Sequence, residues 1–192
     1  MKKQAVLFIL MLIPMFVGCS DQKASATRQR WMEIKNATDN LIDEMSYAND
    51  SVSAKSQDGL AESLAQATSS VHACQTFNIA LVSQNRINVD SRLNKVAEKL
   101  ILSSDSLLNQ TKRGQDAIIK IQQLIQERGT TSDSQKEQEI NALLDDMNVA
   151  QRNGAGVLIQ IQKHYQELET LRLELNKQYG FELPQIKWMN QQ

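Results

Sequence analysis

The positions of its two prolines limit the possible folds of this chain more than any other feature. The 192 residues contain only Pro14 and Pro184, and both lie near an end of the chain. Proline removes a backbone donor and kinks a helix, so the long stretch between these two residues can form continuous helices. Aromatic residues make up only 5% of the sequence, and together with the scarcity of proline this favours an all-α fold.

Apolar residues recur at helical spacing in four segments, which predicts four helices at about residues 28–56, 60–84, 90–128 and 134–179. The helix ends also have recognisable signals. Asp90 is a predicted N-cap, Ser134 and Glu137 have the spacing of a capping box, and Gly180 is a predicted C-cap. In the second segment the apolar stripe contains Leu60, Leu64, Ala67, Val71, Cys74, Phe77 and Leu81.

Short connections between these segments make sequence neighbours antiparallel, so we expect an elongated antiparallel bundle of about four helices, the last two long. If the last two form a hairpin about Thr131, Gly114 faces about Val149 and Gly154 faces about Asn109. Glycine is unfavourable inside a helix and needs a reason. One hypothesis is a shared waist where the two backbones approach or bend together. The alternative is that each glycine ends one helix and starts another, which gives five or six helices.

The first twenty residues have the pattern of an export signal. Lys2 and Lys3 precede an apolar run at residues 5–17. A basic start followed by about a dozen apolar residues is typical of a signal peptide, whereas a membrane-spanning helix needs about 20 apolar residues.

The end of this run, Val17, Gly18 and Cys19, resembles the lipobox of bacterial lipoproteins, although Phe16 stands where that family commonly has an aliphatic residue. The resemblance implies cleavage before Cys19 after its thiol has received diacylglycerol. Ordinary secretion, with cleavage by signal peptidase I near Cys19 or Ser20, is the alternative. Both interpretations export the chain.

In such lipoproteins, a serine after the lipidated cysteine usually permits sorting to the outer membrane, and Ser20 follows Cys19 here. The resemblance therefore implies a protein anchored by lipid to the periplasmic face of the outer membrane. The expected organisation is a signal peptide at 1–18, a lipidated N-terminus and polar linker at 19–27, a helical bundle at 28–180 and an apolar tail at 181–192.

Composition and motifs argue against several functions. Of 21 basic residues, Lys2 and Lys3 leave with the signal peptide, so the mature chain has 19 basic and 22 acidic residues. The resulting net charge of about −3 argues against nucleic acid as a partner. We expect no catalytic residues, no metal site and no cofactor, because the two histidines, His72 and His164, lack the further ligands or catalytic groups that such sites require.

Cys74 lies on an apolar seam and is expected to be a buried, inert thiol. An intermolecular disulfide or a reactive thiol is the alternative.

The tail after Gly180 has an apolar side chain at nearly every second position, and Pro184 prevents it from continuing the helix. One interpretation is a plug that folds back over the open end of the bundle. The other is an extended peptide offered to a partner, with Phe181, Ile186 and Trp188 as the binding residues and Trp188 as the anchor.

The combination of an anchor, exposed helices and no catalytic constellation predicts a non-enzymatic envelope lipoprotein that acts as a helical protein-protein interaction or assembly factor. Its expected partners are the membrane, through the lipid, and another envelope protein or a second copy. The alternative is an oligomeric structural spacer lipoprotein of the cell envelope.

Overall fold

The computed structural model describes residues 2–47, 57–82, 87–126 and 133–187, with side chains from residue 21 onward except 45–47, 57–58 and 133. It contains four helices: α1 (Lys2–Tyr47), α2 (Gln57–Val82), α3 (Ser91–Gln126) and α4 (Asp133–Tyr179). The described ranges contain no strand, and α3 and α4 are 36 and 47 residues long. The predicted all-α bundle of four helices, with the last two long, is therefore confirmed.

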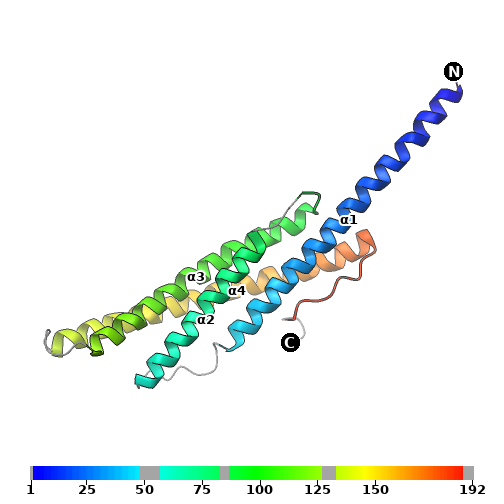
Figure 1. Ribbon diagram of the computed structural model, residues 1–192. Helices are drawn as coiled ribbons and strands as arrows, with labels where there is room; N and C mark the ends of the chain where they lie inside the picture. Colours follow the sequence, from blue (N-terminus) through cyan, green and yellow to red (C-terminus); the bar gives the residue numbers. More distant parts are fainter. Residues whose placement is uncertain (1, 48–56, 83–86, 127–132, 188–192) are drawn as a thin grey trace.

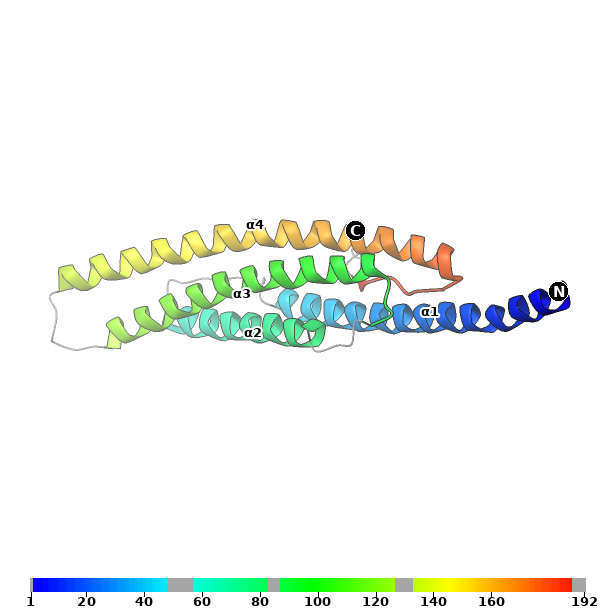
Figure 2. The same ribbon diagram turned by 90° about the horizontal axis from the view of Figure 1, so that it is seen from above.

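α1 begins much earlier than the sequence predicted. It runs without a break through residues 20–27, where we expected a polar linker. This segment contains neither glycine nor proline, and adding a residue to an existing helix is far easier than starting a new one. As a helix its eight residues span about 12 Å, less than half of their extended length. Figures 1 and 2 show the N-terminal part of α1 projecting beyond the other three helices.

The four helices are packed in sequence order. α2 packs against both α1 and α3, and α4 packs against α3. Figure 2 shows α3 between α4 on one side and the α1–α2 pair on the other. Among the residues that the structure describes, no helix combines the length and the hydropathy that a membrane span requires.

Ion pairs across the α3–α4 hairpin report its register. Lys99 Nζ lies 2.6 Å from Glu167 Oε2, and Arg113 pairs with Asp146. Each acidic partner lies within about one helical turn of the position that the predicted hairpin assigns to it. The register of the two long helices could therefore be predicted from the position of the turn.

The helix ends agree with two of the three predicted signals. The backbone N–H of Arg92 donates to Asp90 Oδ1 over 3.0 Å, so Asp90 is the N-cap of α3. Gly180 has a φ of 69°, and the N–H of Phe181 donates to the carbonyl of Asn176, which is a Schellman C-cap. The predicted capping box is wrong, because α4 already begins at Asp133 and Ser134 lies inside it.

The buried apolar side chains form two clusters along the bundle. The larger cluster joins all four helices and the C-terminal segment, and it includes Trp31, Ile34, Phe77, Leu81, Leu93, Leu100, Leu168, Leu175 and Ile186. The smaller cluster lies toward the α3–α4 turn and consists of Leu60, Ile118 and Ile121 with partly buried neighbours. The candidate functional site lies between these two clusters.

Candidate functional site

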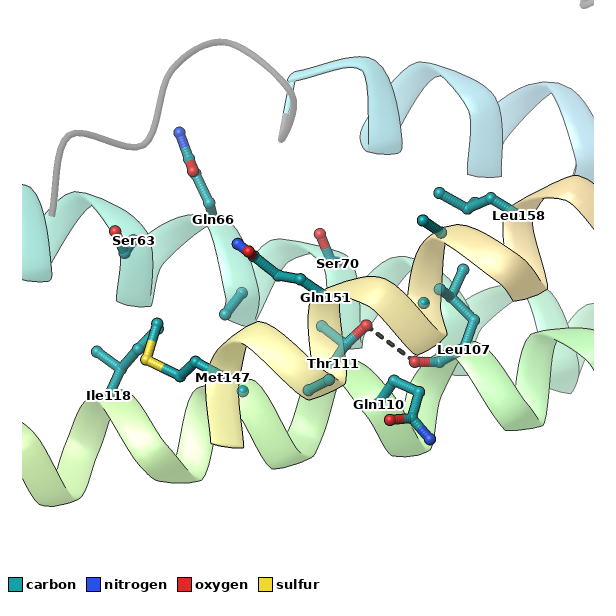
Figure 3. A pocket seen from close by; sticks show the side chains of 15 residues that line it. Ser63, Gln66, Ser70, Leu107, Gln110, Thr111, Ile118, Met147, Gln151 and Leu158 are labelled. Atoms are coloured by element: carbon teal, nitrogen blue, oxygen red, sulfur yellow. Dashed lines mark hydrogen bonds between the residues drawn. The ribbon is translucent and has the colours of Figure 1, made fainter. Parts of the chain in front are cut away.

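A pocket of about 370 Å³ opens between α2, α3 and α4. Figure 3 shows Ile118 and Met147 at one end and Leu107 and Leu158 at the other. The other lining residues are small or carry uncharged polar groups, and they are Ser63, Gln66, Ala67, Ser70, Gln110, Thr111, Gly114, Ala150, Gln151, Gly154 and Ala155. An engineered cavity of about 150 Å³ suffices to bind benzene, so this pocket has room for a sizeable apolar group.

Gly114 of α3 and Gly154 of α4, which were predicted to lie at nearly the same height, both line this pocket. α3 and α4 are continuous through Gly114, Gly154 and Gly156, so the alternative of five or six helices is wrong. A Cβ on Gly154 would lie 3.8 Å from Leu107 Cδ1, which is ordinary contact, whereas a Cβ on Gly114 would meet nothing within 4 Å. The waist is therefore a place where side-chain volume is missing. No neighbouring backbone lies close enough to require a glycine at position 114.

Polar groups line the pocket beside its apolar ends. Thr111 Oγ1 donates to the carbonyl of Leu107, and Ser63 Oγ donates to the carbonyl of Gly59. Within the described residues, Gln110 Oε1 is buried and accepts no hydrogen bond. The amides of Gln66 and Gln151 lie on the same side of the pocket, one from α2 and one from α4 (Figure 3). The pocket can thus combine apolar contacts with hydrogen bonds from uncharged groups.

The C-terminal segment after Gly180 folds back between α4 and α1 (Figure 2). The indole N–H of Trp31 donates to the carbonyl of Pro184 over 3.1 Å, and Arg172 donates to the carbonyl of Leu183 over 3.0 Å. The backbone N–H of Lys187 donates to Asp39 Oδ1 over 2.8 Å. Side chains from two helices thus pair with the backbone of an extended segment that has no strand partner.

The three predicted partner-binding residues of this segment differ in their surroundings. Ile186 is completely buried in the larger core cluster, as is Leu183 with only 3% of its surface exposed. Phe181 is half-buried and stacks on Tyr179, with ring centroids 5.3 Å apart. Trp188 lies outside the described residues. Ile186 has no free surface to offer to a partner in this conformation, which favours the plug over the docking peptide. The segment packs along α1 from Trp31 to Asp39, however, and not over an open end of the bundle as the plug was predicted to do.

The two cysteines lie in different parts of the fold. Cys19 lies within α1, outside the range in which side chains are described. Cys74 is a free, fully buried thiol, and burial raises its pKa to about 11. A thiol of this kind is a poor nucleophile at neutral pH, so the inert interpretation of Cys74 fits the structure.

Neither histidine is part of a larger cluster in the described part of the chain. His164 Nδ1 lies 3.7 Å from Glu167 Oε1, on the same face of α4, and His72 is exposed. Glu167 also accepts a hydrogen bond from Lys99 Nζ, and this bond lowers the pKa of the Glu167 carboxyl. No group of three or more metal-ligating side chains comes together among the residues that the structure describes.

The pocket residues were not found by sequence reasoning, apart from the glycines. A signal was present in α2, where small residues at Ser63, Ala67 and Ser70 precede the larger Phe77 and Leu81 along the helix. Small side chains on one helix leave a pocket only when the neighbouring helices also carry small side chains at the same height.

No protein-family model matches this chain, and no curated protein or solved structure matches it either.

Proposed function

We propose that the protein is a non-enzymatic lipoprotein of the bacterial cell envelope that binds another envelope protein through its helical faces, as an interaction or assembly factor. A lipid on Cys19 anchors it to the periplasmic face of the outer membrane. The resemblance of residues 17–19 to a lipobox supports the anchor, and the pocket that opens between three helices of the described chain supports binding of a protein.

The pocket between α2, α3 and α4 is the observation that supports this proposal most directly. Within the described part of the chain, three of the four helices line it, namely α2, α3 and α4, while α1 is described only as far as Tyr47. Its position also suits a tethered protein. The 28 residues that follow Cys19 up to the end of α1 at Tyr47 span about 42 Å as a helix, so the pocket is held away from the lipid rather than against the membrane surface.

The anchor is tested by replacing Cys19 with alanine. Cys19→Ala should abolish labelling with palmitate and processing by the lipoprotein signal peptidase, because that enzyme acts only on the lipidated cysteine. Cys74→Ala is the control and should be labelled and processed like the unmodified chain. Normal processing and membrane retention of Cys19→Ala would contradict the lipoprotein assignment.

The interaction is tested by affinity purification of the full chain from the intact envelope after mild crosslinking. We expect one foreign envelope protein to be recovered in constant ratio to the bait. Recovery of the bait alone would contradict the proposal.

The second candidate is an oligomeric spacer, for which the observation is a set of exposed aliphatic side chains. Ile79 is 68% exposed, Leu102 is 70% exposed and Leu173 is 58% exposed. Such side chains on three different helices could join copies of the chain side by side. The same purification separates the candidates, because a spacer recovers only further copies of itself.

A further inference from the structure

The face of α2 that packs against α1 extends beyond the end of α1. Ala37 and Leu41 of α1 line a small crevice together with Ala73, Phe77 and Ala80 of α2. The stripe through these α2 residues continues at heptad spacing toward the start of the helix, first at Ser70, then at Gln66 and Ser63.

These last three residues of the stripe line the pocket. Figure 1 shows that α1 ends short of the N-terminal end of α2. A helix placed in line with α1 would therefore lie directly over the pocket, on a continuation of an interface that already binds a helix.

The lining defines the chemistry of such a helix. None of the fifteen lining residues is charged, so a charged side chain inserted here would lose its hydration without gaining an ionic partner. The floor offers Leu107, Ile118 and Leu158 for apolar contact, and Met147 has a flexible side chain that adapts to different shapes. The amides of Gln66 and Gln151 at the edge can bond to uncharged polar side chains.

We propose that this pocket binds an amphipathic helix of another envelope protein, lying in line with α1. Two or three turns of that helix insert aliphatic side chains, spaced three or four residues apart, between α2 and α4, and uncharged polar residues flank them. This inference rests on the proposed function and names the surface and the partner that the function uses.

Photo-crosslinking in the intact envelope tests the proposal. The photoreactive residue p-benzoylphenylalanine is placed at Gln66 or Gln151, beside the pocket, in the full chain. The matched controls are Gln75 on α2 and Gln160 on α4, which are exposed and do not line the pocket. We expect an adduct with the same foreign protein from both pocket positions and from neither control. The linked peptide should carry aliphatic residues at helical spacing.

A second variant fills the pocket without removing a contact. Gly114→Leu adds a side chain where a Cβ meets nothing within 4 Å, and Gly156→Leu adds the same side chain to an exposed position that does not line the pocket. Gly114→Leu should reduce the adduct by about tenfold or more, as expected for blocking the centre of an interface, while Gly156→Leu leaves it unchanged. The melting temperature of each variant shows that it is folded.

Several outcomes would overturn the inference. Adducts from the control positions alone would leave the proposed function standing but place the interface elsewhere. An adduct with a second copy would make the pocket a contact between copies, and an adduct with residues 48–56 of the same chain would show that the protein fills its own pocket. An adduct that persists in Gly114→Leu would mean that the partner does not enter the pocket. If no position gives an adduct and the purification recovers nothing, the proposed function fails as well.

Discussion

At the scale of single residues, Asp90 connects three helices at one end of the bundle. Its Oδ1 caps α3, its Oδ2 accepts from the hydroxyl of Tyr179 on α4, and its backbone N–H donates to Thr27 Oγ1 on α1. The Arg92 guanidinium, hydrogen bonded to the carboxylate, lowers the pKa of Asp90 from its ordinary 3.8 to about 2. The charged form of Asp90 is thus favoured by folding.

A lowered pKa makes stability depend on acid in a defined direction. The contribution of Asp90 is complete above about pH 4 and is lost as the pH falls toward 2. Asp90→Asn should lower the free energy of unfolding at neutral pH by about 1 to 2 kcal/mol and reduce its pH dependence in this window. Urea unfolding at several pH values measures both effects. The exposed Asp116→Asn on the same helix is the control, and an equal effect of both changes would contradict the role of Asp90.

Two leucines on the seams of α3 and α4 test the position of the core. Leu168 is fully buried, whereas Leu107 is buried but borders the pocket. Leu168→Ala should cost about 2 to 5 kcal/mol, and Leu107→Ala should cost less, because part of its surroundings is already empty. Denaturant unfolding of both variants provides the comparison. A loss below about 0.5 kcal/mol for Leu168→Ala would mean that the assigned core is exposed.

At the scale of helices, the glycines have opposite roles that depend on backbone conformation. Gly114 and Gly156 lie in helix interiors, with nothing within 4 Å of an added Cβ, whereas Gly180 ends α4 with a φ of 69°. Gly156→Ala and Gly114→Ala should each stabilise the protein by up to about 1 kcal/mol, the usual difference in helix propensity. Gly180→Ala should destabilise it by about 1 to 2 kcal/mol, because alanine is strained at positive φ. Melting temperatures that fall in all three variants would contradict this assignment.

At the scale of the whole molecule, the C-terminal segment joins α4 to α1. Removing residues 181–192 exposes the surfaces against which Leu183 and Ile186 pack, so the melting temperature should fall by roughly 10 °C, the effect expected for losing two buried aliphatic side chains. Partner capture should persist, because the pocket lies elsewhere in the bundle. Calorimetry and the same purification measure the two effects, with the exposed Glu182→Ala as control. Unchanged stability together with loss of the partner would instead favour a docking tail.

The helices could be predicted from the amino-acid sequence, because helix formation depends on local properties. The absence of proline between Pro14 and Pro184, the apolar periodicity, the N-cap at Asp90 and the C-cap at Gly180 each act within a few residues. The register of the α3–α4 hairpin followed from the place of its turn. Residues 20–27 are an exception, because their polar composition is typical of a linker and yet α1 continues through them without a break.

The position of the pocket depends on how the helices pack against one another and could not be predicted from any one of them. Small residues on one helix leave no pocket if a neighbour fills the space, so the site depends on the relative heights of Ser70, Gly114 and Gly154 on three helices. The place of the C-terminal segment is also a tertiary result, because the groups that hold its backbone, Trp31 and Asp39, lie about 150 residues away in the sequence. Such distant contacts depend on how the helices pack together, which the pattern of a single segment does not contain.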